Sequence, residues 1–302
     1  MDFSRHAHDN SGVQPIPLSQ RRGLIFPALA WSGFTSALAS IIVGSQLQAG
    51  LGTFDALFAV ILGNWILFVY SAAIGFAAGR WGLSSQLVLE VVFGRWGAAV
   101  PGLLLGSLVT GWFAFHIVLT TTILSAVWRL PAGSTLSVCI VGVLFAMPLI
   151  TRVSRGFNLT ALAYPAMALF AAIVIARQLA PQWAVLLDGP IRPIGGTLPF
   201  GTGVCIAFGT FVVSGTMTGD IVRYCRTGNE AVLATAIAFL LSNLPFLILG
   251  VLIAAAGVKV TALFAARDAL SFVSLALVIL ANWTTCDACL GNASVTLKSA
   301  NS

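Results

Sequence analysis

The chain has 302 residues, of which 58% are hydrophobic and only 8% are charged, with 15 Lys and Arg against 9 Asp and Glu. Soluble domains carry about 25% charged residues, so this composition cannot cover a surface that faces water. It predicts an all-α polytopic membrane protein surrounded by membrane lipid. The net charge of +6 does not indicate a nucleic-acid partner, because the sequence holds no basic patch with interleaved aromatic residues.

Apolar stretches long enough to cross a bilayer recur along the chain. A spanning helix needs about 20 mostly apolar residues, and eight segments reach that length or come close. The polar residues 1–22 are expected to be a cytoplasmic tail, followed by one transmembrane domain over 23–302. Prolines and a glycine pair predict an extended surface loop at 181–198. The predicted spans are 24–48, 55–79, 98–128, 135–150 and 157–180, and then 199–222, 231–256 and 266–290.

The basic residues predict the orientation of the chain. With the amino terminus inside, ten of the fifteen Lys and Arg fall on the inner side and five on the outer side. Because cytoplasmic loops carry the excess of Lys and Arg, we expect a cytoplasmic amino terminus in the cell (plasma or inner) membrane. The inner set is Arg5, Arg21, Arg22, Arg80, Arg95, Arg152, Arg155, Arg223, Arg226 and Lys298, and the outer set is Arg129, Arg177, Arg192, Lys259 and Arg267.

Two of the predicted spans are interrupted by small polar residues. The first contains Trp31-Ser32-Gly33-Phe34-Thr35-Ser36, and the sixth contains Gly209-Thr210-Phe211-Val212-Val213-Ser214-Gly215-Thr216. Gly costs a helix about 1 kcal/mol relative to Ala, and hydroxyls can bond to backbone groups that a break leaves free. Such backbone survives at membrane depth only where it lines a cavity or is buried in protein. Close helix packing through small residues is the alternative explanation.

The spacing of the two interruptions favours a binding site. They lie in spans one and six, and paired interruptions at matching positions of two repeats are typical of a transporter site near the membrane midplane. Five spans is an odd number, so repeats offset by five must be inverted. Thr210 and Ser214 in the second interruption are therefore candidate substrate ligands.

Further candidate ligands lie in spans three and eight. Trp112 follows a glycine that leaves its indole face open, and aromatic faces stack planar heterocycles. His116 lies one turn on, where an ionisable residue at membrane depth indicates function, although a hydrogen-bonded neutral His is an equal alternative. Asn282 precedes Thr284 and Thr285, whose hydroxyls could supply oxygen ligands to a small cation. Hydroxyls that bond back to their own helix are the other reading of these threonines.

Several of these segments resemble a known family. They are Gly33 through Leu62-Gly63-Asn64, Gly111-Trp112-Phe113, Gly215-Thr216-Met217-Thr218-Gly219-Asp220-Ile221-Val222-Arg223-Tyr224, Ser242-Asn243 and Trp283-Thr284-Thr285-Cys286-Asp287. Together they resemble the nucleobase–cation symporter family, first class, which comprises purine/cytosine permeases, and in particular its bacterial cytosine permease branch. The resemblance extends from about residue 20 to residue 290.

The resemblance implies a leucine-transporter-like fold of two inverted five-helix repeats and two further helices. It implies that the substrate ring stacks between Trp112 and Phe211. It also implies a Na⁺ site formed by backbone oxygens of Gly33 and Ala37 with the hydroxyls of Thr284 and Thr285. The family has about twelve helices, whereas eight spans are predicted here. The resemblance therefore implies that the last helices of the family are missing from this sequence.

The sequence departs from the branch at polar positions of the implied site. The branch's glutamine of helix three falls at Val109, and a serine of helix six falls at Val213, beside Ser214. Asparagines of helix eight fall at Ala281, with Asn282 displaced by one residue, and at Cys286. A site that loses hydrogen-bonding groups changes its substrate. We therefore expect a planar heterocycle rather than cytosine in particular.

The predicted function is import of a nucleobase or a related planar heterocycle, such as cytosine, a purine or a hydantoin. Transport is expected to be coupled to Na⁺ or H⁺ and to use no other cofactor. The alternative is a truncated, non-transporting remnant of such a permease. An enzyme is not expected, because the sequence holds no DxxD pair, HExxH motif or GxSxG elbow.

Overall fold

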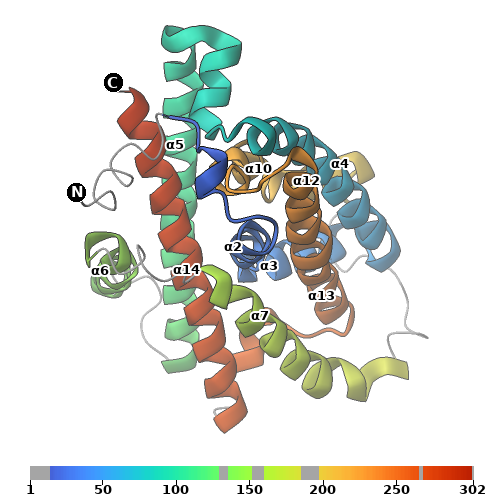
Figure 1. Cartoon of the computed structure of the whole chain (residues 1–302). Coiled ribbons are helices and arrows are strands. Elements are labelled where there is room, and N and C mark those ends of the chain that lie inside the picture. The colour runs from blue at the N-terminus through green and yellow to red at the C-terminus, as the bar shows by residue number, and fades with distance from the viewer. Residues whose placement is uncertain (1–13, 129–134, 152–159, 185–196, 265–267, 301–302) are drawn as a thin grey trace.

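The computed structural model describes residues 14–128, 135–151, 160–184, 197–264 and 268–300, and every regular element in these ranges is a helix (Figure 1). The extended loop predicted at 181–198 lies mostly outside them. The elements are η1 (Leu18–Gln20), α2 (Ile25–Thr35), α3 (Leu38–Leu51), α4 (Thr53–Trp81), α5 (Ser85–Trp128), α6 (Thr135–Thr151), α7 (Thr160–Val174), η3 (Ile175–Leu179), η4 (Ala180–Gln182), α9 (Phe200–Gly209), α10 (Val212–Thr216), α11 (Gly219–Val222), α12 (Gly228–Ala236), η5 (Ile237–Asn243), α13 (Leu244–Ala255), η6 (Val260–Phe264) and α14 (Ala269–Ala300).

Within the described residues, each predicted span falls on helices, and the first residues of the spans 157–180 and 266–290 lie outside those residues. Five helical stretches among the described residues are long and apolar enough to cross a membrane, and six if α2 and α3, bent by 50° at their junction, count as one span. The other two predicted spans are shorter: α6 is apolar over Leu136–Met147, and the sixth predicted span is divided into α9, α10 and α11. The all-α prediction is confirmed.

The helices form two groups in Figure 1. Long helices α5 and α14 lie side by side, with α6 outside them, and α7 crosses below. Helices α2, α3, α4, α12 and α13 gather on the other side, and the broken α9–α11 segment packs against α4. Large apolar side chains point outward from both groups, including Phe58 and Trp65 of α4 and Leu104 of α5. These faces suit contact with lipid tails, which need no polar partner.

Glycines allow the closest approaches between helices. A Cβ added to Gly44 of α3 would lie 2.0 Å from the carbonyl oxygen of Leu247, and one added to Gly250 of α13 would lie 2.0 Å from the carbonyl oxygen of Ile41. A Cβ on Gly33 of α2 would lie 1.6 Å from the carbonyl oxygen of Thr160 in α7. Close packing through small residues is a main source of helix association in membranes, and it accounts for these glycines here.

The end of the predicted tail is anchored to two other segments. The Arg21 side chain is buried, and its guanidinium donates to the carbonyl oxygen of Gly79 at 2.7 Å and that of Ile16 at 3.0 Å. It also lies within 3.5 Å of the carbonyl oxygens of Cys225 and Arg226. Burial lowers the pKa of the Arg21 guanidinium, and the carbonyl acceptors offset part of that desolvation. Arg21 therefore joins the start of the first span, the end of α4 and the segment after α11.

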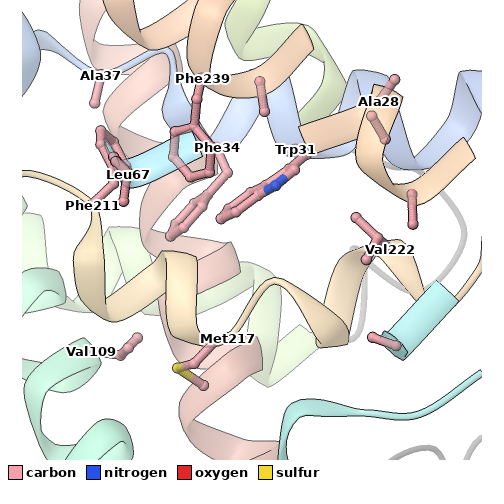
Figure 2. Close-up of a cluster of buried hydrophobic side chains, with 14 of the residues drawn as sticks. Ala28, Trp31, Phe34, Ala37, Leu67, Val109, Phe211, Met217, Val222 and Phe239 are labelled. Carbon is pink, nitrogen blue, oxygen red and sulfur yellow. The ribbon is translucent and has the colours of Figure 1, made fainter. Parts of the chain in front are cut away.

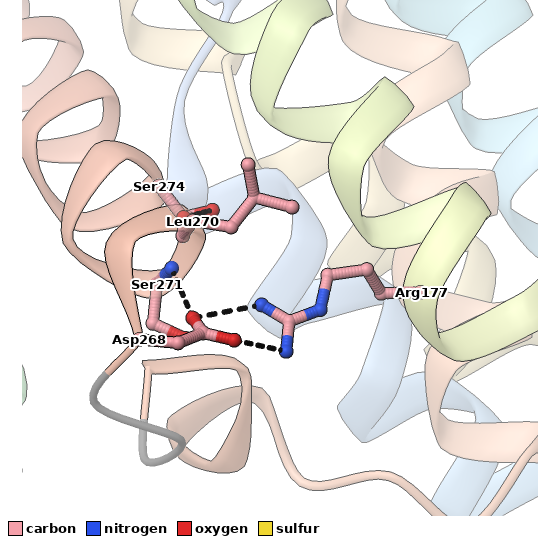
Figure 3. Close-up of polar contacts among 5 residues, drawn as sticks. All are labelled: Arg177, Asp268, Leu270, Ser271 and Ser274. Atoms are coloured by element: carbon pink, nitrogen blue, oxygen red, sulfur yellow. Dashed lines mark hydrogen bonds and ion pairs between the residues drawn. The ribbon is translucent and has the colours of Figure 1, made fainter.

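An ion pair joins α14 to the segment after α7. Arg177 donates two hydrogen bonds to Asp268, at 2.6 and 3.0 Å, and Asp268 accepts the backbone N–H of Ser271 at 2.8 Å (Figure 3). Asp268 thereby caps the amino-terminal end of α14, an interaction typically worth about 1 kcal/mol. The ion pair itself is largely exposed to solvent and contributes less, as surface pairs do.

The glycine contacts give a stability prediction. Gly250→Ala places a methyl group against the backbone of α3, and we expect it to destabilise the protein by about 1–3 kcal/mol, as overpacking does. Gly291 of α14 is the matched control, because a Cβ there meets no atom within 4 Å. Gly291→Ala should leave the melting temperature unchanged or raise it, since Ala favours a helix. Equal melting temperatures for the two variants in detergent would contradict the packing of α3 on α13.

Candidate functional site

The first predicted interruption is a real break. Helix α2 ends at Thr35 and α3 begins at Leu38, with a 50° bend between them. Ser36 leaves the helical region at φ −81° and ψ 73°, and Ala37 is extended at φ −116° and ψ 144°. The carbonyl of Ser32 accepts both the backbone N–H of Ser36 at 3.0 Å and the Ser36 hydroxyl at 2.7 Å, so α2 stays hydrogen-bonded up to the break.

The second interruption is also a break. Helix α9 ends at Gly209, and Phe211 adopts φ −133° and ψ 16° before the short α10 begins. A second irregularity at Met217 separates α10 from α11. Both interruptions read from the sequence are therefore confirmed, and both lie where helices of the two groups meet.

A small cavity lies between the two breaks and the long helices α5 and α14. Its volume is about 10 Å³, room for about one water molecule. A planar ring can enter only after side chains move apart. The cavity is lined by Phe34 and Ala39 from the first span, Trp112 and His116 from α5, Thr210, Phe211 and Ser214 from the sixth span, and Thr285 and Cys289 from α14. Six of the ten predicted ligand residues thus share one cavity: Trp112, His116, Thr210, Phe211, Ser214 and Thr285.

Aromatic rings surround one side of this cavity. Phe211 is buried and meets Phe34 edge-on, with ring centroids 6.0 Å apart and planes inclined by 74°. Behind Phe34, Trp31 stacks at 5.5 Å, and Phe239 closes the cluster (Figure 2). Trp112 is only half-buried and contacts Phe115, at 5.3 Å between centroids. Phe211 is therefore fixed by core packing, whereas Trp112 packs only partly buried against the same cluster and lines the cavity wall.

Polar groups of α5 and α14 meet next to the cavity. Asn282 Nδ2 donates to the Thr120 hydroxyl at 3.1 Å, and that hydroxyl donates to the carbonyl of His116 at 2.8 Å. The side chains of His116 and Asn282 lie against each other, and their buried Nδ1 and Oδ1 atoms make no hydrogen bond of good geometry among the described residues. Buried polar atoms without partners are rare in proteins. Asn282 does not line the cavity itself but stands behind His116.

The predicted cation ligands are only partly brought together. The hydroxyls of Thr284 and Thr285 each donate to the carbonyl of Ala281 at 2.9 Å, as in the back-bonded alternative. Ala37 lies in the break and packs in the same buried cluster as Cys289, one turn beyond Thr285. Gly33 has a packing role, since its Cα faces Thr160 of α7.

Three lining residues were not predicted from the sequence. Phe34 lies inside the first interrupted stretch, and its position beside Gly33 was the available signal. Cys289 follows Thr285 by four residues and so shares its helix face. Ala39 carries no functional group, so the sequence contains no signal for it.

Comparison with known proteins decides the family. A profile described as "Permease for cytosine/purines, uracil, thiamine, allantoin" matches residues 15–299. The chain belongs to this permease family. It is a multi-pass membrane protein of a transporter family and not an enzyme, as the sequence predicted.

Individual relatives agree with this assignment. Cytosine permease of Escherichia coli K12 is 30% identical over 262 residues, and the match covers 83% of this chain and 59% of that protein. The cytosine permease of Escherichia coli O157:H7 is 29% identical, with the same coverage. This chain thus spans 59% of the length of these permeases.

Solved structures show the same fold. Mhp1, a nucleobase-cation-symport-1 family transporter in a closed conformation with bromovinylhydantoin bound, superposes with a TM-score of 0.75 at 21% identity, covering 95% of this chain and 68% of that one. Its inward-facing conformation gives a TM-score of 0.73 at 18% identity, covering 95% of this chain and 71% of that one. The predicted leucine-transporter-like fold is confirmed by this likeness.

Proposed function

We propose that the chain imports a nucleobase or a related planar heterocycle across the cell membrane by symport with Na⁺ or H⁺. The observation that carries the proposal is the cavity, where two helix breaks meet aromatic and polar side chains of α5 and α14. The relatives are cytosine permeases and a nucleobase–cation symporter, which supports a substrate of this class.

The substrate ring is proposed to stack between Trp112 and Phe211. The buried Phe211 ring is held in place by its contact with Phe34 and would contact one face of the substrate ring. The half-buried indole of Trp112 would contact the other face. Thr210 and Ser214 supply hydroxyls on one side of the ring, with His116 on the other and Asn282 behind His116. The buried His116 Nδ1 lies on the cavity wall and suits the polar edge of a heterocycle, which would provide a hydrogen bond.

The coupling cation is proposed to bind backbone oxygens of Gly33 and Ala37 together with Thr284 and Thr285. Each threonine uses its proton on the carbonyl of Ala281, which leaves the hydroxyl lone pairs for a cation. A hydroxyl can donate one hydrogen bond and still offer two lone pairs. Oxygen atoms are the ligands that small hard cations prefer. Coupling to H⁺ would instead involve His116.

A non-transporting remnant is the second candidate. The chain spans 59% of the length of its permease relatives. It nevertheless includes the first span, α5, the sixth span and α14, which together line the cavity. A remnant would therefore retain ring binding without accumulation of the substrate inside the cell, and this difference separates the two candidates.

Transport should depend on the indole face of Trp112. In cells that express this chain, a panel of labelled cytosine, uracil, adenine and hydantoin should show accumulation of at least one ring. Trp112→Ala should weaken binding of that ring by about 1–3 kcal/mol, roughly six- to 150-fold, and Trp112→Phe should lose much less because an aromatic face remains.

The same panel is measured for binding to the purified protein, with melting curves as a control for folding. Ring binding without accumulation would favour the remnant. Equal affinities of the wild type and Trp112→Ala would contradict the stacking site.

The amino terminus is proposed to be cytoplasmic. Arg21 holds together three segments that the charge distribution assigns to the inner side, near Gly79, Cys225 and Arg226. Arg22 adds a second contact between these segments, because its backbone N–H donates to the carbonyl of Tyr224 at 2.8 Å. Segments in mutual contact must share one side of the membrane, and this side carries the basic excess.

Reporter fusions should test this orientation. Fusions at Ser302 and within the 181–198 loop should report a cytoplasmic and an external location, respectively. An external signal at Ser302 would contradict either the orientation or the number of spans.

A further inference from the structure

Uncharged polar side chains surround the break between α2 and α3. We call them the break network: Thr35 and Ser36 at the break, Ser40 in α3, Asn64 in α4, and Ser242 and Asn243 in η5. All of them are fully buried. Within the residues that the structure describes, none of its members comes from α5, α7 or α14.

Ser242 inserts into the break itself. Its hydroxyl donates to the carbonyl of Ser32 at 2.9 Å. Ser36 Oγ lies 2.7 Å from both that carbonyl oxygen and Ser242 Oγ. Ser242 thus adds a hydrogen bond to a carbonyl that already accepts the backbone N–H of Ser36 at 3.0 Å, and it ties the end of α2 to η5, 210 positions later in the chain.

Two asparagines extend the break network away from the break. Ser40 donates to Asn243 Oδ1 at 2.7 Å, and Asn243 Nδ2 donates to Asn64 Oδ1 at 2.7 Å. Asn64 Nδ2 then donates to the carbonyl of Phe239 at 2.8 Å. This chain of bonds links α3, α4 and η5 and ends on backbone.

The acceptor at the end of this chain belongs to a π-helix. Segment η5 covers Ile237–Asn243, and π-helical turns are rare and frequently occur at functional sites. Its carbonyls at Ala238 and Phe239 accept hydrogen bonds from Thr35 and Asn64, at 2.9 and 2.8 Å. The irregular turn of η5 and the break of the first span therefore stabilise each other.

Stability alone does not account for this arrangement. Interhelical hydrogen bonds in membranes each contribute little to stability on average. Replacing both partners by apolar groups of the same shape can be nearly neutral. Hydrogen-bonding side chains can fix the direction of the backbone oxygens at the break, whereas apolar side chains cannot.

We propose that Ser242, Asn243 and Asn64 are positioning residues that fix the backbone of the α2–α3 break for the coupling cation. The inference rests on the proposed cation site at Gly33, Ala37, Thr284 and Thr285. The break network supplies the outer shell of that site: its side chains bind Ser32 and η5 and leave the oxygens further along the break directed at the cation. Outer-shell partners of this kind set the orientation of the ligands that touch a metal ion.

The test measures Na⁺ affinity rather than transport. Melting temperatures of the purified protein are recorded over a series of NaCl concentrations, with choline chloride holding the ionic strength constant. We expect Na⁺ to raise the melting temperature of the wild type. Ser242→Ala should raise the half-saturating Na⁺ concentration by about 10- to 100-fold, the usual effect of losing an outer-shell partner. Ser242→Thr keeps a hydroxyl and should stay close to the wild type.

The matched control is Thr235→Val. Thr235 is as buried as Ser242 and lies seven residues earlier, but its hydroxyl donates within its own helix, to the carbonyl of Ala231 at 2.8 Å. This variant should keep the wild-type Na⁺ dependence whatever its melting temperature in choline. An unchanged half-saturating concentration in Ser242→Ala would overturn the positioning role alone. A wild type that does not respond to Na⁺ would overturn the cation site and, with it, this inference.

Discussion

The structure depends on one constraint: backbone polar groups freed at membrane depth find no water and must be satisfied by the protein. Unbroken helices such as α4 and α14 meet this requirement within themselves. The first and sixth spans do not, because Ser36, Ala37 and Phe211 leave helical geometry. Much of what surrounds these positions follows from their need for partners. Ser242 bonds the hydroxyl of Ser36 at the first break, and the cavity lies where the irregular backbone meets α5 and α14.

The two breaks differ in how they are supported, and the difference matches their proposed roles. The first is enclosed by hydroxyl and amide side chains from α4 and η5, which hold its backbone in a fixed shape. The second is enclosed by aromatic side chains, with Phe211 held against Phe34 and Phe239. Fixed oxygens suit a small cation, and aromatic faces suit a planar ring. Away from the breaks, Gly44 and Gly250 permit close backbone packing between α3 and α13.

Local features of the structure could be predicted from the sequence, and contacts between distant residues could not. The length of the apolar stretches predicted the spans, and small polar residues predicted both breaks. Each of these signals lies within a single segment of the sequence. The relation between the breaks followed from their offset of five spans. The hydrogen bond from Ser242 to Ser32 joins residues 210 positions apart, and it depends on the rotation of η5 about its axis, which no local pattern specifies. The packing of Gly33 against Thr160 depends on helix register in the same way.

The central claim is that the cavity between the breaks is where a planar ring binds, and Cys289 offers the most direct test because its side chain lines that cavity. Methyl methanethiosulfonate reaches the buried Cys289 only when the cavity opens, and modification can be followed at each cysteine by mass spectrometry, with exposed Cys205 of α9 as the internal reference. We predict that a ring which raises the melting temperature also slows modification of Cys289 and leaves that of Cys205 unchanged. A ring that stabilises the protein while Cys289 reacts at its original rate would show that binding occurs elsewhere and would contradict the account.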